Sequence, residues 1–194
     1  MSCSSCYTRH DVAPPTLRST RLAALAASLF AALSLSLPAQ ALGWHDALPQ
    51  AMAVGSGEFR WLGFSIYSAR LWSGRGPFDA NAPFALELTY HRAISRNRLI
   101  QTSIEQIRRL YGDGLSANKL KYWELEMARA FRDVVAGDQL IGVFLPLQGC
   151  RFYSQKEWIA DIPDQEFATA FFSIWLNERT ADPKLRTRLL GATQ

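Results

Sequence analysis

The hydrophobic pattern of this chain changes period three times, and these changes limit the folds open to it. Apolar residues alternate as in strands up to Tyr90, recur every three or four positions from Ser95 to Gly137, alternate again from Leu140, and return to a helical period after Asp164. Strands repeat every two residues and helices every 3.6. Two helices therefore lie between two groups of strands, without the regular strand–helix alternation that a parallel sheet requires. We expect an α+β domain with a mostly antiparallel sheet covered by a layer of helices.

The strand signal is strongest before Tyr90. Residues 58–72 are dense in aromatic, β-branched and other apolar side chains, and Gly63 interrupts them directly after Leu62. Such an interruption predicts a bulge or tight turn between two strands. Residues 84–90 predict a third strand, which places four apolar side chains on one face: Phe84, Leu86, Leu88 and Tyr90. Later strands are expected over residues 140–147, 151–153 and 158–159.

Four helices are predicted from capping residues that precede apolar stripes. Ser and Asp side chains at a helix start accept hydrogen bonds from the free backbone N–H groups of the first turn. The four expected caps are Ser95, Ser116, Asp164 and Asp182, the last followed by Pro183. The first stripe contains Ile100, Ile104, Ile107 and Tyr111 before Gly112, and the second continues through Phe131 and Val134 to Gly137.

The N-terminal segment has the pattern of a secretory signal peptide. Arg18 and Arg21 precede an apolar run over residues 22–37, and Pro38-Ala39-Gln40-Ala41 then offers small residues for cleavage. The run is shorter than the roughly 20 residues that span a bilayer as a helix. We therefore expect a signal peptide over residues 1–41, a domain over residues 42–194, no stable membrane span after cleavage, and a periplasmic or secreted protein.

The charge balance argues against nucleic acid as a partner. The chain has 21 Lys and Arg residues against 17 Asp and Glu residues, a formal net charge of +4, and these charges are spread along the sequence. Nucleic-acid binding requires a concentrated basic surface, and this excess is too small to predict one.

Cysteine and histidine usage argues against a metal site and a cofactor. Cys3 and Cys6 belong to the expected leader, so Cys150 is left without an intrachain disulfide partner. His45 and His91 are the histidines of the remaining chain, and neither lies in a metal-ligand motif. We expect Cys150 to be a packed residue rather than a nucleophile, because no base is placed beside it by the sequence.

Three arginines surround the start of the first predicted helix. Arg92, Arg96 and Arg98 flank the Ser95 cap, where the helix dipole is positive and cations are disfavoured. Such crowding is consistent with a bound anion, held by guanidinium groups and free N–H groups. The alternative interpretation is that these arginines point to water or pair with acids such as Glu87.

Aromatic residues make up 12% of the chain, which suits either a dense core or an apolar ligand pocket. Core packing is the default for the two groups concerned, which are Phe59, Trp61, Phe64, Tyr67 and Trp72 in the first strands and Phe171, Phe172 and Trp175 in the third helix. Tyr67 and Tyr90 are the better pocket candidates, because a buried phenol needs a polar partner. The candidate ligand-binding residues are therefore Tyr67, Tyr90, Arg92 and Arg96.

Several segments together resemble the exported bacterial branch of the chalcone isomerase-like family. They are residues 62–72 (LGFSIYSARLW), 85–90 (ALELTY), 167–176 (FATAFFSIWL) and 180–186 (TADPKLR). The resemblance covers residues 57–191 and implies an open-faced β-sandwich with a helical layer. This architecture agrees with the order of strands and helices.

The resemblance also bears on function. Plant members close a flavanone ring by adding a phenolate, and an Arg, a Thr, a Tyr and an Asn bind and polarise substrate and water. The corresponding positions here carry Gln50, Leu62, Leu99 and Gln106, and leucine cannot donate a hydrogen bond. Other members bind fatty acids through an Arg and a Tyr in the same cleft. We therefore expect a non-catalytic binder of a small apolar ligand, such as a fatty or aromatic acid.

Two other functions stay open. An isomerase or intramolecular lyase with a rearranged site would use Tyr67, Tyr90 and Arg92. A protein-interaction module of the periplasm would need no pocket. A polar pocket with a water position favours the enzyme, an apolar tunnel favours the binder, and a filled core with an exposed aromatic patch favours the interaction module.

The leader pattern generates a prediction about processing. When the chain is expressed in an exporting bacterium, osmotic release should yield soluble protein that begins at Leu42. N-terminal sequencing of the released protein checks this. Released protein that still carries residues before Leu22 would contradict it.

Overall fold

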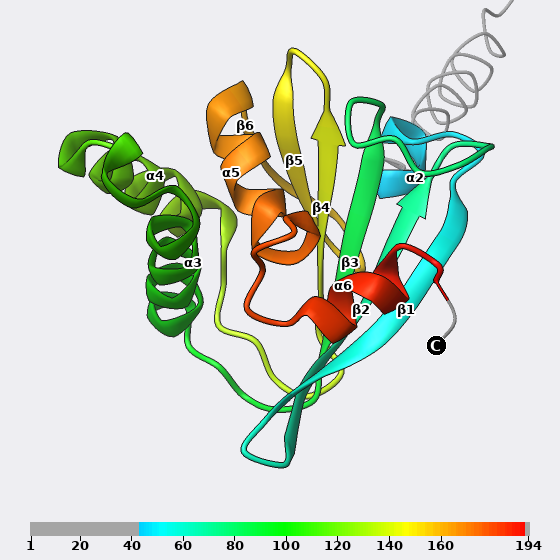
Figure 1. Cartoon of the computed structure of the whole chain (residues 1–194), viewed down its shortest axis with the longest axis horizontal. Helices are drawn as coiled ribbons and strands as arrows, with labels where there is room; N and C mark the ends of the chain where they lie inside the picture. Colours follow the sequence, from blue (N-terminus) through cyan, green and yellow to red (C-terminus); the bar gives the residue numbers. More distant parts are fainter. Residues whose placement is uncertain (1–42, 193–194) are drawn as a thin grey trace, which may run out of the picture. The chain divides into compact units, whose positions relative to one another are not determined.

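The computed structural model describes residues 43–192, which form a six-stranded sheet with helices on one face (Figure 1). The strands follow one another in the sheet in the order of the sequence, and every neighbouring pair is antiparallel. They are β1 (Met52–Trp61), β2 (Phe64–Ser73), β3 (Phe84–Tyr90), β4 (Gln139–Leu145), β5 (Gly149–Ser154) and β6 (Trp158–Ile162). The expected leader, residues 1–41, lies outside the described residues.

Four longer helices cover one face of this sheet. They are α3 (Arg96–Tyr111) and α4 (Ala117–Ala130), which connect β3 to β4, and α5 (Gln165–Leu176) and α6 (Pro183–Leu189), which follow β6. Two shorter helical segments are α2 (Trp44–Ala47) and the 3-10 turn η2 (Gly112–Gly114). The expected α+β class and mostly antiparallel sheet are thus confirmed. No helix within residues 43–192 is both long and apolar enough to cross a bilayer.

The alternation in β3 divides the apolar residues between two clusters. Phe84, Leu86, Leu88 and Tyr90 belong to the main core between the sheet and the helices, as their spacing predicts. Ala85 belongs to a smaller cluster on the opposite face, where Trp44 of α2 packs on the sheet. The sheet is therefore covered by a helical layer on one face and, among the described residues, mainly by the short α2 on the other.

All four predicted helix caps are formed. Each capping oxygen accepts a hydrogen bond from the backbone N–H three residues later, which satisfies a donor that the helix leaves free. The pairs are Ser95 with Arg98 at 3.3 Å, Ser116 with Lys119 at 3.2 Å, Asp164 with Phe167 at 2.9 Å and Asp182 with Leu185 at 2.9 Å.

The second helix ends earlier than its apolar stripe predicts. α4 ends at Ala130, and the next residue, Phe131, has an extended backbone. Phe131 and Val134 are buried as expected, but they lie in an extended segment rather than in the helix. The reason is tertiary, because Val134 pairs with Ile94 in an antiparallel bridge. Similarly, Leu110 rather than the predicted Tyr111 is the last buried residue of α3.

The close approach of α6 to β1 depends on glycine. A Cβ atom on Gly55 would lie 2.1 Å from the carbonyl oxygen of Arg188, and one on Gly57 would lie 2.5 Å from the Arg188 side chain. The last turn of α6 thus lies directly on the backbone of β1. This contact fixes α6, and Asp182 at its start, beside the first strand.

We expect Gly55→Ala to lower the free energy of unfolding by about 1–3 kcal/mol, because backbone must move to admit the new methyl group. Gly74→Ala is the matched control, since a Cβ atom at Gly74 meets no heavy atom within 4 Å. Urea unfolding followed by circular dichroism measures both. Equal stability of the two variants would contradict the role given to this contact.

Candidate functional site

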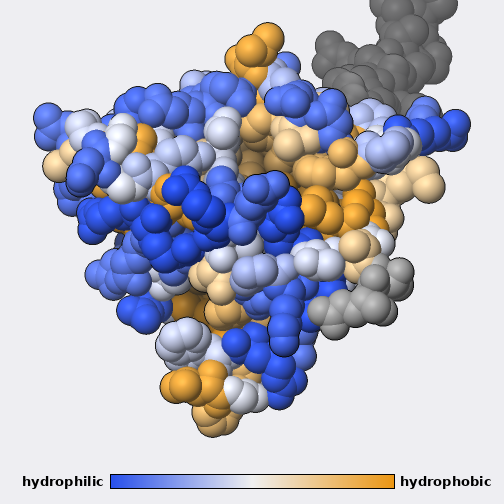
Figure 2. All heavy atoms as spheres, viewed as in Figure 1, coloured by the Kyte–Doolittle hydropathy of each residue, from blue (hydrophilic) through white to orange (hydrophobic). Residues whose placement is uncertain are grey.

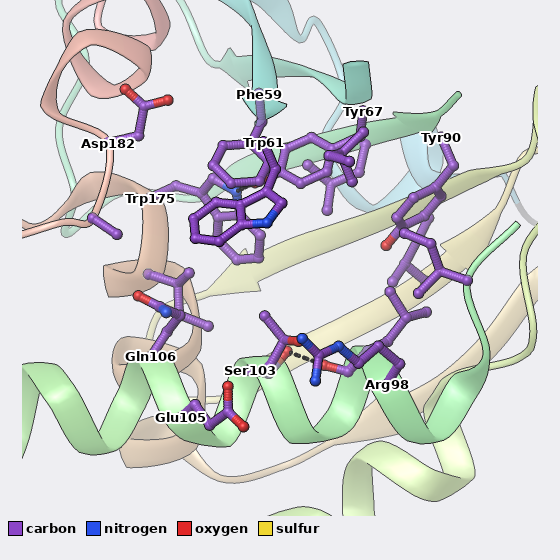
Figure 3. A pocket seen from close by; sticks show the side chains of 18 of the residues that line it. Phe59, Trp61, Tyr67, Tyr90, Arg98, Ser103, Glu105, Gln106, Trp175 and Asp182 are labelled. Carbon is purple, nitrogen blue, oxygen red and sulfur yellow. Dashed lines mark hydrogen bonds between the residues drawn. The ribbon is translucent and has the colours of Figure 1, made fainter. Parts of the chain in front are cut away.

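A cavity of about 640 Å³ lies between α3, α5 and α6 on one side and the first strands on the other (Figure 3). Most of its wall is apolar or aromatic. The sheet contributes Phe59, Trp61, Ile66, Tyr67, Leu88, Tyr90 and Leu140, and the helices contribute Leu99, Phe171, Ile174, Trp175 and Leu185. A cavity of this size and lining is typical of small-molecule sites.

The cavity exists because α3 is held away from the strands, by packing on other helices and by contacts near both of its ends. α3 packs mainly on α4 and α5 rather than on the sheet. Near its start, Ile94 bridges to Val134, and the Asp133 carboxylate accepts a hydrogen bond from the Arg96 N–H at 2.7 Å. Near its end, the Arg109 guanidinium donates to the Arg179 carbonyl oxygen at 2.8 Å. Space remains between the middle of α3 and the strands.

The cavity wall of α3 is a stripe of polar residues, interrupted by Leu99, beside the buried isoleucine stripe. It consists of Arg98, Thr102 and Glu105 in one row and Leu99, Ser103 and Gln106 in the next. Positions three and four residues apart share a face, so these residues line one side of the helix. The Ser103 hydroxyl is bound internally, to the Leu99 carbonyl oxygen at 2.9 Å, as the dashed line in Figure 3 shows.

Tyr67 and Tyr90, the two predicted pocket tyrosines, both line the cavity. The Tyr67 hydroxyl accepts a hydrogen bond from the Trp175 indole N–H at 3.0 Å, and its ring stacks on Phe59. The Tyr90 side chain is only 3% exposed, and its hydroxyl has no hydrogen-bond partner among residues 43–192. Figure 3 shows this hydroxyl pointing into the cavity.

Burial raises the pKa of both phenols above the ordinary tyrosine value. Both groups therefore keep their proton at neutral pH. The Tyr90 hydroxyl can donate a hydrogen bond to a ligand, and it is a poor candidate for a base in this neutral form.

The structure separates the three arginines. Arg92 and Arg98 line the cavity, whereas Arg96, the fourth predicted site residue, does not. Two residues along a helix correspond to about 200° of rotation, so Arg96 and Arg98 cannot face the same way. The helical spacing separates the two arginines, but only the rotation of α3 in the fold decides that Arg98 is the one facing the cavity.

Of the alternative interpretation, the exposure of the three arginines to water is observed, whereas their pairing with nearby acids is not. Within the described part of the chain, Arg92, Arg96 and Arg98 make no ion pair. Glu87 instead accepts hydrogen bonds from the Trp72 indole at 3.0 Å and from Gln139 at 3.3 Å. Arg92 and Arg98 are exposed, so the cavity has two available cations at its mouth.

The opposite end of the cavity has a different charge. Asp182, which caps α6, and Gln106 line this end, as Figure 3 shows. Arg98 and Tyr90 lie together at the other end in the same view. The cavity is therefore polarised along its length, with a cationic, hydrogen-bond-donating end and an acidic end.

Of the four positions that the family resemblance singled out, two line the cavity and two do not. Leu99 and Gln106 line the cavity, so the positions of the plant tyrosine and asparagine do face this space. Leu62 lies in the β1–β2 turn with 81% of its surface exposed, and Gln50 precedes β1. Neither of these two residues lines the cavity. Within residues 43–192, two of the four positions that the resemblance singled out therefore lie at the cavity, and they carry leucine and glutamine.

Cys150 is 2% exposed, and burial raises the pKa of its thiol, which disfavours the thiolate form that a nucleophile requires. Among residues 43–192, no three His, Cys, Asp or Glu side chains are grouped so that they could hold a metal ion.

These features define a class of protein: an antiparallel sheet with helices on one face and an apolar cavity between the two layers. The chain belongs to the chalcone isomerase-like family, whose sequence profile matches residues 75–191. An uncharacterized protein of Haemophilus influenzae is 30% identical over 142 residues, which are 73% of this chain and 68% of that protein.

A solved structure shows the same fold. The crystal structure of a fatty-acid binding protein of Arabidopsis thaliana aligns with a TM-score of 0.56 and 10% identity, over 78% of this chain and 90% of that one. At this identity the likeness concerns the fold alone.

We expect ring closure of chalcones to proceed near the uncatalysed rate. Leu99 places no donor where the plant enzymes have a tyrosine, and loss of one such donor typically lowers the rate about 10²- to 10³-fold. The decay of chalcone absorbance measures the rate, with heat-denatured protein as the control. Turnover comparable with that of plant isomerases, and lost on denaturation, would contradict this prediction.

Proposed function

We propose that this protein is a non-catalytic binder of a small apolar acid, such as a fatty or aromatic carboxylic acid. The acid's carboxylate lies at the cationic end of the cavity, beside Arg98 and Tyr90, with Arg92 at the mouth. Its apolar part lies along Leu88 and Phe171.

The observation that carries this proposal is the Tyr90 hydroxyl. Buried polar groups are almost always hydrogen-bonded, and the Tyr90 oxygen can go without a protein partner because it borders the open cavity rather than being fully enclosed. This hydroxyl is directed into the cavity and finds no partner among the described residues. A carboxylate oxygen accepts the hydrogen bond that Tyr90 can donate and meets the positive charge of Arg98.

The charge pattern supports an acid over a base or a neutral polar ligand. Arg92 and Arg98 have no acidic partner in the described structure, while Asp182 and Glu105 make the other end of the cavity acidic. An anion at the Asp182 end would be repelled. The apolar lining between the two ends favours a hydrocarbon or aromatic body.

The structural neighbour supports the same ligand class. It is a fatty-acid binding protein, and it shares the fold that encloses the cavity. The apolar lining and the missing donor at Leu99 also favour binding over ring closure. The N-terminal leader pattern supports binding outside the cytoplasm, as a periplasmic or secreted protein.

Isothermal titration calorimetry with dodecanoic acid tests the site. Arg98→Ala should weaken binding about tenfold, the lower part of the range for charge-assisted hydrogen bonds, because the guanidinium is exposed. Arg96→Ala is the matched control: it removes the same charge from the same helix turn, outside the cavity, and should change the affinity less than about twofold. Dodecanol should bind Arg98→Ala and the parent equally, since it has no charge.

Tyr90→Phe separates binding from folding. It should weaken dodecanoic acid binding about threefold to tenfold, and it should not lower the melting temperature, because the hydroxyl has no protein partner to lose. If Arg96→Ala and Arg98→Ala weaken binding equally, or if neither does, the proposed position of the carboxylate is wrong.

A further inference from the structure

The turn between β1 and β2 exposes a concentrated apolar surface. Trp61, Leu62 and Phe64 are 63%, 81% and 62% exposed, and we call these three residues the hairpin tip. The hairpin extends away from the helices at the bottom of Figure 1. Figure 2 shows hydrophobic side chains gathered at this end of the hairpin, below a largely hydrophilic surface.

Folding does not account for the leucine in this tip. Leu62 has a φ of 49°, in the left-handed region that favours Gly, Asn and Asp and is unfavourable for leucine. Asn at this position would satisfy the turn and remove an exposed apolar side chain. Leu147, in the β4–β5 turn, has a similar φ of 63° and is 93% exposed, but no aromatic residue adjoins it in the sequence.

Two guanidinium groups lie on the hairpin tip. Arg60 donates a hydrogen bond to the Gly63 carbonyl oxygen at 2.7 Å, and the Arg92 guanidinium lies 5.3 Å from the centroid of the Phe64 ring. Glu58 is paired with Arg60 at 3.0 Å, so the charge of Arg60 is balanced. Arg92 has no acidic partner in the described structure, and its positive charge remains unbalanced. Exposed aromatic and leucine side chains next to arginines match the chemistry of a membrane–water interface.

The tip is continuous with the mouth of the cavity. Trp61 and Arg92 line the cavity, and Trp61 is also part of the tip. In Figure 3 the Trp61 indole lies between Phe59 and Ser103, across the cavity from α3. A hydrocarbon chain that leaves a bilayer at the tip would therefore reach the cavity without crossing open water.

We propose that the hairpin tip docks on an anionic phospholipid bilayer, with Trp61, Leu62 and Phe64 at the level of the headgroups and the cavity mouth turned toward the lipid. The docking proposal depends only on the exposed residues of the hairpin tip. The purpose of the docking, the exchange of an apolar acid between bilayer and cavity, rests on the proposed function.

Flotation with vesicles tests the docking. The parent and every variant are expressed with the natural N-terminal segment in an exporting bacterium. They are purified after the cell has processed them, so all carry the same N-terminus. Vesicles of phosphatidylcholine with phosphatidylglycerol should bind the parent, and vesicles of phosphatidylcholine alone should bind it less. The variant L62N/F64T should bind the mixed vesicles about tenfold or more weakly, because two apolar side chains are lost from the interface.

The matched control is Leu147→Asn, which makes the same exchange at a left-handed turn at the opposite end of the sheet. It should bind the mixed vesicles within about twofold of the parent. The proposal is overturned if the parent does not bind vesicles, if L62N/F64T binds as well as the parent, or if Leu147→Asn loses binding equally. Equal binding to both lipid compositions would overturn the anionic preference.

Calorimetry with dodecanoic acid in solution keeps the two proposals apart. Leu62 and Phe64 do not line the cavity, so L62N/F64T should retain the parent's affinity for the acid. Loss of vesicle binding with unchanged acid affinity supports docking as a separate property. Loss of both would show that the two substitutions disturb the fold. Leu62→Asn alone, which suits the left-handed turn, then becomes the test. It must lower vesicle binding while keeping the affinity for the acid, or the docking proposal fails.

Discussion

The site in this structure depends on how α3 is held. α3 packs mainly against other helices, and the bridge between Ile94 and Val134 fixes its start beside β3 and β4. If α3 lay directly on β2 and β3, the space that Tyr90 faces would be filled by its side chains. Close packing is the rule in protein interiors, so a cavity of about 640 Å³ requires a support of this kind.

The same arrangement explains why the cavity is apolar on one side and polar on the other. The sheet presents the core face of β2 and β3, which carries Tyr67, Leu88 and Tyr90. α3 presents a stripe with Arg98 and Gln106 that would face water if the helix were isolated. The unpartnered Tyr90 hydroxyl lies where these two surfaces meet the cavity. An apolar ligand with an acidic group satisfies both surfaces at once.

Family membership sets the fold at this site but does not by itself set the side chains that line the cavity. The chain has the chalcone isomerase-like fold, and Leu99 and Gln106 occupy the cavity wall where the resemblance placed a catalytic tyrosine and asparagine. Leucine at position 99 keeps the wall apolar and removes a donor. A fold can retain its cavity while its chemistry changes, because the cavity depends on helix support and the chemistry depends on a few side chains.

The sequence by itself determined the local structure. The caps Ser95, Ser116, Asp164 and Asp182 and the turn at Leu62 and Gly63 depend on neighbours within a few residues, and local hydrogen bonds suffice to specify them. It also singled out Tyr67, Tyr90 and Arg92, since a tyrosine in an apolar strand and a cation at a helix start are locally unusual.

Only the tertiary structure decided the end of α4, the part played by Arg98 and the existence of the cavity. α4 stops at Ala130 because Val134 pairs with Ile94, about forty residues earlier in the chain. Arg98 faces the cavity because helix packing fixes the rotation of α3, and a polar stripe that faces a cavity has the same sequence pattern as one that faces water. An empty space between two layers leaves no periodic signal in the chain, because it is produced by contacts between residues distant in sequence.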